Sequence, residues 1–220
     1  MGYIRVKGAP LIIMLGDSIT EIASDPRRQG FQVQLTGDYV GRADVINRGI
    51  SGWNTAMWLD VLPAMIDEWR EKQPMLIVIF LGTNDASLPT GESKARYVPL
   101  DKYKENLHKL VASFSAAYPL CKYIFLSPPP VNNGAWSHTD KLNEVTAHYA
   151  AACLDVAKEL KIPAVDFYNT MQGQWDLFYD GLHFSPKGMI LAHELITKCI
   201  REAYPAMTPE ALPHEFIHDL

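Results

Sequence analysis

The stretch Leu11-Ile12-Ile13-Met14-Leu15-Gly16-Asp17-Ser18-Ile19-Thr20 decides the fold. It joins a run of five apolar residues to a turn with small polar side chains. A short apolar run that is bounded by turn residues is typical of a buried strand. Because Ser18 follows this strand at the expected start of a helix, the stretch predicts the first strand and turn of a βα unit. We therefore expect the polar residues at 16–20 to lie at the carboxyl end of a strand.

Four more apolar runs follow and alternate with segments of helical periodicity. The five predicted strands are Leu11–Leu15, Ala43–Asn47, Met75–Leu81, Tyr123–Leu126 and Ala164–Phe167. The predicted helices are Phe31–Tyr39, Trp58–Lys72, a helix capped by Asp101 and ended by Pro119, Asp140–Leu160 and Pro186–Ala203. This alternation is the pattern of a parallel sheet with helical crossovers. It predicts a three-layer α/β/α fold, flavodoxin-like, with five parallel strands.

The length of 220 residues and the composition indicate one globular domain, which we place at 1–204, followed by an irregular C-terminal tail at 205–220. The formal net charge is −5 and there is no basic run, so nucleic acid is not expected as a partner. Three cysteines without a CxxC pair favour a reducing compartment. No run approaches the ~18 apolar residues that a membrane helix needs. We expect a cytoplasmic protein without membrane insertion.

Polar residues gather directly after the predicted strands, where an open parallel sheet holds its ligand. The clusters are residues 16–20, 47–55, 82–85 and 180–183. Each cluster alone is equally compatible with turn and N-cap chemistry. Together they supply a hydroxyl, an imidazole, a carboxylate and hydrogen-bond donors for an oxyanion at one end of one sheet. This is the set of groups that nucleophilic catalysis by serine requires.

The four clusters resemble the sequence blocks of the SGNH, or GDSL-type, hydrolases. They contain Gly-Asp-Ser at 16–18, a glycine in the second block, Gly-x-Asn-Asp at 82–85 and Asp-x-x-His at 180–183. Within this family, the segments NRGISGWNT, GTNDA and DGLHFSPKG most resemble those of the isoamyl acetate-hydrolysing esterase subgroup. Ile19 stands where the family usually has leucine. The resemblance implies the SGNH fold and hydrolysis of carboxylic esters through an acyl-enzyme. It implies no metal and no organic cofactor.

The resemblance also implies roles for individual residues. Ser18 would be the nucleophile, His183 its general base, and Asp180 the carboxylate that orients His183. The oxyanion hole would consist of the Ser18 N–H, the Gly52 N–H and the Asn84 side-chain amide. Spacing alone does not choose between Gly49 and Gly52. We expect Asp17 and Asp85 to be structural, because aspartates beside turns accept backbone N–H bonds.

The substrate and partner predictions are coarser. Trp53, Asn54 and Trp136 are candidate substrate contacts, and the loops 87–99 and 128–138 form either a lid, an acyl pocket or plain connections. The resemblance implies a small-molecule ester with a short, acetate-like acyl group. Thioesters, lysophospholipids and acetylated sugars remain open. Apolar residues in the tail leave a homo-oligomer open as well.

Two readings from other classes compete with an ester hydrolase. His214-Glu215-Phe216-Ile217-His218 matches the H-E-x-x-H pattern of zinc peptidases. Pro213 precedes this segment and no third ligand follows it, so we interpret the match as a coincidence in the tail. The second competitor is a binding module that keeps the fold and performs no chemistry. The presence of every expected polar group argues against it.

Overall fold

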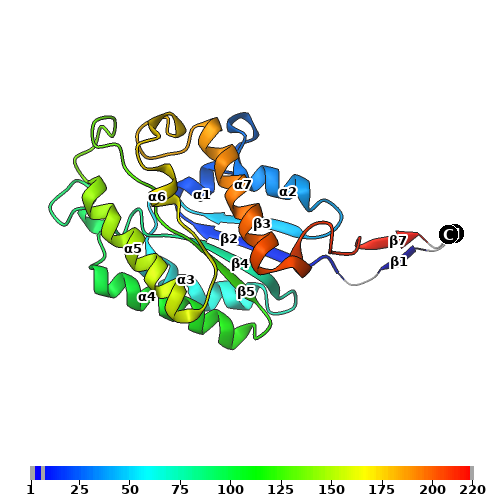
Figure 1. Ribbon diagram of the computed structural model, residues 1–220. Coiled ribbons are helices and arrows are strands. Elements are labelled where there is room, and N and C mark those ends of the chain that lie inside the picture. The colour runs from blue at the N-terminus through cyan, green and yellow to red at the C-terminus, as the bar shows by residue number, and fades with distance from the viewer. Residues whose placement is uncertain (1–2, 6–7, 219–220) are drawn as a thin grey trace.

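A five-stranded parallel sheet forms the centre of the computed structural model, which describes residues 3–5 and 8–218. Its strands are β2 (Leu11–Gly16), β3 (Asp44–Gly49), β4 (Pro74–Phe80), β5 (Lys122–Leu126) and β6 (Ala164–Val165). The spatial order is β3-β2-β4-β5-β6, and every neighbouring pair is parallel (Figure 1). The predicted α/β class and five-stranded flavodoxin-like sheet are confirmed.

Helices cover both faces of the sheet. They are α1 (Ser18–Ile22), α2 (Phe31–Asp38), α3 (Thr55–Glu68), α4 (Leu100–Ala117), α5 (Asn143–Leu160), α6 (Phe167–Met171) and α7 (Pro186–Ala203), with short 3-10 turns η1 (Pro26–Arg28), η2 (Lys94–Arg96), η3 (Trp175–Leu177) and η4 (Pro205–Met207). Figure 1 shows α3, α4 and α5 on one side of the sheet and α2 and α7 on the other. The result is the expected three-layer arrangement.

The alternation of side chains along β2 explains the two layers of core. Leu11, Ile13 and Leu15 pack with residues of α3, α4 and α5, whereas Ile12 and Met14 pack with residues of α2 and α7. Every residue of β2 is buried. Both faces of such a strand are buried, so the side chains on each face are apolar. Its sequence is therefore a continuous apolar run without alternation of apolar and polar residues. This burial fixes Gly16 and the turn that follows at the edge of the core.

Several predicted boundaries shift for local reasons. The helix predicted from Trp58 begins at Thr55, because the Asn54 side chain caps it by accepting a hydrogen bond from the Met57 N–H at 2.9 Å. The sequence predicted Asp101 as the N-cap of α4, but Pro99 holds the N-cap position and makes no side-chain hydrogen bond there. The last strand ends at Val165, because Asp166 caps α6 through the Asn169 N–H.

The C-terminal tail is more ordered than predicted. Its end, β7 (Phe216–His218), pairs antiparallel with β1 (Tyr3–Arg5), and this two-stranded sheet projects from the body (Figure 1). Sequence reasoning missed both strands, because a three-residue strand gives little periodicity to detect. The expectation of an irregular tail is corrected for 216–218.

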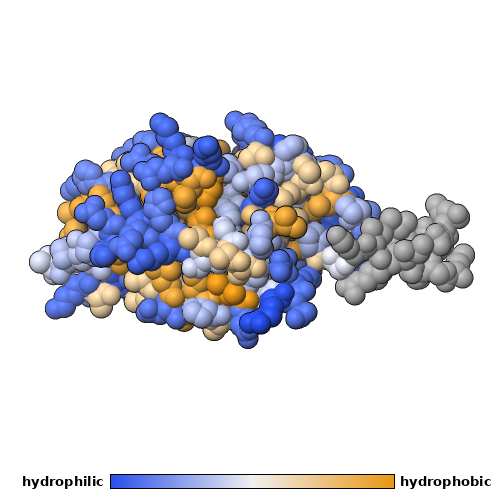
Figure 2. All heavy atoms as spheres, turned by 90° about the horizontal axis from the view of Figure 1, so that it is seen from below, coloured by the Kyte–Doolittle hydropathy of each residue, from blue (hydrophilic) through white to orange (hydrophobic). Residues whose placement is uncertain are grey.

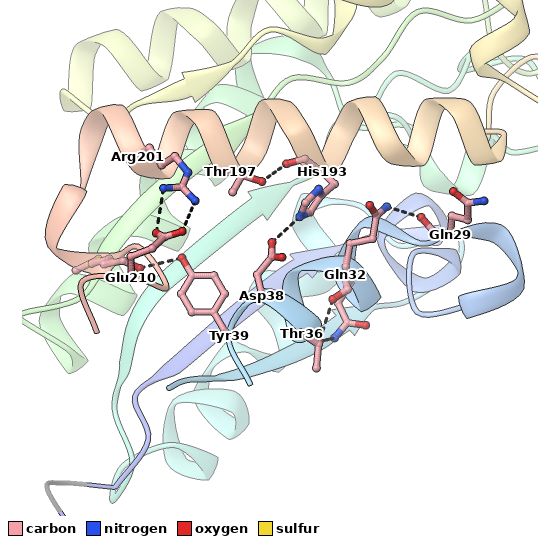
Figure 3. Close-up of polar contacts among 11 residues, drawn as sticks. Gln29, Gln32, Thr36, Asp38, Tyr39, His193, Thr197, Arg201 and Glu210 are labelled. Atoms are coloured by element: carbon pink, nitrogen blue, oxygen red, sulfur yellow. Dashed lines mark hydrogen bonds and ion pairs between the residues drawn. The ribbon is translucent and has the colours of Figure 1, made fainter. Parts of the chain in front are cut away.

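The tail docks on α2 and α7 of its own chain. The Tyr39 hydroxyl donates to the Met207 carbonyl at 2.8 Å, and Arg42 donates to the carbonyl of Leu212. Figure 3 shows the neighbouring contacts, in which Arg201 of α7 forms two hydrogen bonds with Glu210. The same view shows His193 of α7 pointing at Asp38 at the end of α2, with Nε2 and Oδ2 2.6 Å apart. Polar contacts therefore join α2, α7 and the tail.

The surface is mixed in character. On the face shown in Figure 2, hydrophilic residues separate patches of apolar side chains. The large hydrophobic side chains that are exposed lie far apart in the chain, at Val40, Ile50, Leu120, Tyr179 and Ile190. In the described part of the chain, no helix is long and apolar enough to cross a membrane.

Candidate active site

The carboxyl end of the sheet brings the predicted sequence blocks together. β2 ends at Gly16 and leads directly into α1, whose first residue is Ser18. The Asp17 side chain caps α1 by accepting a hydrogen bond from the Ile19 N–H at 2.9 Å. The backbone N–H of a first helical residue has no acceptor within its helix, and the helix dipole favours negative charge there. Ser18 therefore stands where an anionic oxygen is stabilised.

Ser18, His183 and Asp180 form a continuous chain of hydrogen bonds. The Ser18 Oγ lies 2.9 Å from the His183 Nε2, and the His183 Nδ1 lies 2.7 Å from the Asp180 Oδ2. The second carboxylate oxygen, Oδ1, accepts from the backbone N–H groups of Leu182 and His183. The backbone thus holds the carboxylate in position, and the carboxylate orients the imidazole toward Ser18.

The electrostatics of Asp180 suit this arrangement. Partial burial disfavours its charged form, but hydrogen bonds from His183 and Leu182 outweigh the burial and lower its pKa below the ordinary value. Asp180 is consequently ionised at neutral pH and accepts a hydrogen bond from the Nδ1–H of His183. That leaves the Nε2 lone pair of a neutral His183 facing the Ser18 hydroxyl.

A hydrogen bond joins Asn84 to Trp53, the residue that follows Gly52. Gly52 has a φ of 82°, in the left-handed region where glycine carries no steric penalty. The Asn84 side chain is buried, and its Nδ2 donates to the Trp53 carbonyl at 2.9 Å. An amide nitrogen has two hydrogens, so one donor of Asn84 remains for another acceptor. The loop after β3 and the turn after β4 are thereby joined.

Two buried aspartates brace these loops. Asp85 accepts hydrogen bonds from the backbone N–H and the hydroxyl of Thr55 at the start of α3. Burial raises the pKa of Asp85 to about 7, while the bonds from Thr55 oppose that rise. Burial likewise raises the pKa of Asp17 to about 6, against the bond from the Ile19 N–H. Both contacts agree with the structural roles that the sequence predicted.

The three candidate substrate contacts occupy different environments. Trp136 is half-buried, and its ring centroid lies 5.9 Å from that of His183 in an edge-on arrangement. Trp53 packs against Trp58 with ring centroids 4.8 Å apart. Asn54 is 3% exposed and uses its amide on the Met57 N–H and the Arg96 carbonyl. This geometry favours a structural role for Asn54 over the predicted substrate contact.

Asp140 and Lys141, which follow the loop 128–138, hold the loop 87–99 through hydrogen bonds. The Lys141 Nζ donates to the Ser87 Oγ at 2.8 Å, and the Leu88 N–H donates to the Asp140 carbonyl at 2.7 Å. The Trp136 Nε1 also donates to the Asp140 Oδ1 at 2.9 Å. Burial lowers the pKa of Lys141 to about 8, although the charges of Asp140 and Asp17 oppose this.

Sequence reasoning did not name Tyr179, which lies directly against the site. Its ring stacks on that of His183 with centroids 5.8 Å apart, and the Arg28 guanidinium covers it at 4.4 Å from its centroid. Tyr179 directly precedes Asp180 in the chain, and this position was the feature of the sequence that could have indicated its contact with the site. His183 is therefore flanked by Tyr179 and Trp136.

The segment His214–His218 does not have the geometry of a zinc peptidase. That motif needs a helix, which places its two histidines on one face one turn apart. Here residues 216–218 form strand β7, and the His214 ring nitrogen Nε2 lies 3.0 Å from the Arg42 guanidinium. Among the described residues, no group of three or more His, Cys, Asp and Glu side chains could hold a metal ion. The interpretation of the motif as a coincidence fits this backbone.

Comparison with known sequences gives consistent relatives. A GDSL esterase/lipase from Arabidopsis thaliana is 31% identical over 226 residues, which cover 95% of this chain and 92% of the relative. The isoamyl acetate-hydrolyzing esterase 1 homolog of Bos taurus is 35% identical over 193 residues, 81% of this chain and 76% of the relative.

Solved structures share the fold. A lipase/acylhydrolase from Enterococcus faecalis superposes with a TM-score of 0.69 at 26% identity, covering 88% of this chain and 96% of the other. Axe2, an acetylxylan esterase from Geobacillus stearothermophilus, superposes with a TM-score of 0.68 at 20% identity, covering 90% and 96%. At that identity the likeness to Axe2 shows the fold alone.

Fold, site and relatives together define a carboxylic ester hydrolase of the SGNH fold. The chain belongs to the GDSL-like lipase/acylhydrolase family, whose model matches residues 14–190. The resemblance found in the sequence, including that to the isoamyl acetate-hydrolysing esterases, is confirmed.

Proposed function

We propose that the protein hydrolyses short-chain carboxylic esters through an acyl-enzyme formed on Ser18. The observation that carries this proposal is the hydrogen-bonded chain from Ser18 through His183 to Asp180, with separations of 2.9 Å and 2.7 Å. A serine hydroxyl is a weak nucleophile until an adjacent base removes its proton. His183 has the position and the orienting carboxylate that such a base needs.

In the proposed reaction, the Ser18 Oγ attacks the ester carbonyl while its proton moves to the His183 Nε2. The negative oxygen of the tetrahedral intermediate accepts hydrogen bonds from the Ser18 N–H, the Gly52 N–H and the second amide hydrogen of Asn84. His183 then gives its proton to the departing alcohol, which leaves an acyl group on Ser18. Water, deprotonated by His183, attacks this acyl group and releases the acid.

The names of the relatives support a small acyl group. The bovine relative, which is 35% identical, is named for isoamyl acetate. That name refers to an acetyl ester, so we propose acetate-like esters and leave the alcohol open. Thioesters, lysophospholipids and acetylated sugars are alternative substrates of the same site.

The test is hydrolysis of 4-nitrophenyl esters from acetyl to octanoyl by the wild type and by Ser18→Ala. We expect turnover that is highest for the shortest acyl groups and is lost in the variant. Turnover that survives the substitution contradicts the role of Ser18. A wild type that hydrolyses no ester in the series favours the non-catalytic binding module.

A further inference from the structure

Arg96 places an exposed positive charge beside the proposed oxyanion hole. It ends η2 in the loop between β4 and α4, and its side chain lies against Gly52. A Cβ atom built on Gly52 would come within 3.0 Å of the Arg96 Cζ and Nη2. The guanidinium therefore takes up the space beside the glycine whose N–H we assign to the ester oxygen.

The guanidinium of Arg96 differs from those of the other arginines whose side chains the structure describes. Each of the others contacts a carboxylate or a carbonyl oxygen, namely Arg27, Arg28, Arg42, Arg48, Arg70 and Arg201. Within the described residues, Arg96 has no such partner for its guanidinium. Arginine side chains pair readily with carboxylates, because their planar fork of donors matches two oxygens. Arg96 is exposed to solvent, so an anion can reach its side chain beside Gly52.

Hydrogen bonds hold the backbone of Arg96, so the fold determines the point from which its side chain projects. Its carbonyl accepts from the Asn54 Nδ2 at 2.8 Å, and its N–H donates to the Ser93 carbonyl at 2.8 Å. Two residues later, the Val98 N–H donates to the Asp85 carbonyl at 3.1 Å. Asn54 and Asp85 also hold the start of α3, so the same contacts position Arg96 and the loop of Gly52.

The acidic side chains of the site are engaged elsewhere. The carboxylate of Asp85 bonds to Thr55, that of Asp180 to His183, and that of Asp140 to Trp136. Asp17 is 1% exposed and caps α1. Lys141, also in this region, adds a second positive charge close enough to repel that of Arg96. An incoming anion would thus meet the exposed guanidinium of Arg96, and the charge of the buried Lys141 would add to its attraction.

We propose that Arg96 binds a carboxylate that the substrate carries close to its ester bond. This inference rests on the proposed function, because it takes the Gly52 N–H as the place of the ester oxygen. A substrate that occupies both groups must hold its ester and its anion only a few atoms apart. The substrate class is then a half-ester of a dicarboxylic acid, or an ester of an alcohol that itself bears a carboxylate.

Two pairs of matched esters test the proposal. The acyl-side pair is monoethyl succinate and ethyl 4-methylpentanoate, and the alcohol-side pair is 4-acetoxybenzoate and 4-acetoxybenzamide. In each pair the first ester carries a carboxylate and the second a neutral group of similar size. The readout is the ratio of kcat/KM for the charged ester to that for the neutral ester, which cancels any general effect of a substitution.

We expect the wild type to prefer the charged ester in at least one pair. The preference should fall roughly 10- to 100-fold in Arg96→Gln, mainly through KM, as for a lost charge-assisted hydrogen bond. Arg96→Lys should keep part of it, and added salt should reduce it because the side chain is exposed. Arg70→Gln, which removes an exposed arginine after the far end of α3, is the matched control and should leave the ratio unchanged.

The outcomes separate this proposal from the one on which it rests. A preference in the acyl-side pair places the anion on the acid part, and a preference in the alcohol-side pair places it on the alcohol part. Equal ratios in the wild type and in Arg96→Gln for both pairs overturn the role of Arg96 while ester hydrolysis stands. Failure of the wild type to hydrolyse any of the four esters, together with the 4-nitrophenyl series, overturns the proposed function itself.

Discussion

The Ser18 Oγ and the His183 Nε2 lie 2.9 Å apart although 165 positions separate them in the sequence. Ser18 follows the first strand of the parallel sheet, and His183 precedes the last long helix, α7. Ser18 and His183 meet at the carboxyl edge of the sheet, which is where open α/β sheets hold their ligands. The fold thus creates the contact on which the proposed chemistry depends.

Asp180→Asn should abolish most activity without unfolding the protein. The asparagine amide would face the His183 Nδ1 and favour the tautomer with the proton on Nε2, which cannot accept the Ser18 proton. We expect kcat to fall by on the order of 10³- to 10⁴-fold. Steady-state kinetics with 4-nitrophenyl acetate measures this, and Asp176→Asn, at an exposed aspartate paired with Lys187, is the control. Equal losses in both variants would contradict the role of Asp180.

Asn84→Ala and Asn54→Ala should separate chemistry from structure. Loss of one oxyanion donor lowers kcat by roughly 10²- to 10³-fold, so we expect that effect for Asn84. Asn54 caps α3, and its loss should lower the free energy of unfolding by about 1 kcal/mol with a much smaller effect on kcat for a neutral ester. Kinetics and urea unfolding of both variants provide the measurement. A larger kcat loss for Asn54→Ala than for Asn84→Ala would reverse the assignment.

Asp85 should make the protein less stable as pH rises. Its pKa is raised by burial from 3.8 to about 7, so the folded state binds this proton more tightly than the unfolded state. The contribution is fully present below pH 3.8 and is lost as pH rises through about 7. The free energy of unfolding of the wild type, relative to that of Asp85→Asn, should therefore fall across this window. Urea unfolding between these pH values tests it, with Asp101→Asn, an exposed aspartate, as control.

The docked tail should stabilise the protein through its buried contacts more than through its exposed ones. Tyr39→Phe removes the hydrogen bond to the Met207 carbonyl from a fully buried ring, which should cost about 1 kcal/mol. Glu210→Gln weakens an exposed pair with Arg201 and should cost less than Tyr39→Phe, because solvent screens exposed ion pairs (Figure 3). Urea unfolding compares the two variants. A smaller loss for Tyr39→Phe would contradict this ranking.

The sequence predicted the central fold because its strands are covered on both faces. Such strands are continuous apolar runs, and β2 is an example in which all six residues are buried. The pairing of β1 with β7 could not be predicted, because each strand has three residues and the pairing joins opposite ends of the chain. Short segments carry too few positions for a period to emerge.

The candidate site was predictable to a different degree for each residue. Ser18, Asn84 and His183 follow strands or lie in motifs of a known family, so the sequence named them. Arg96 lies in a long loop, and its contact with Gly52 depends on hydrogen bonds between separate loops. Asn54 looked like a substrate contact because capping and binding use the same polar side chains. Only the geometry distinguishes these roles.

The most direct test of the account is to locate the nucleophile by covalent labelling. Diethyl 4-nitrophenyl phosphate phosphorylates an activated serine and releases 4-nitrophenol, and peptide mass spectrometry then locates the modified residue. We predict one diethylphosphoryl group per chain, attached to Ser18, with loss of ester hydrolysis in proportion to labelling. A label on another residue that accompanies the loss of activity, or full activity in a protein labelled at Ser18, would contradict the account.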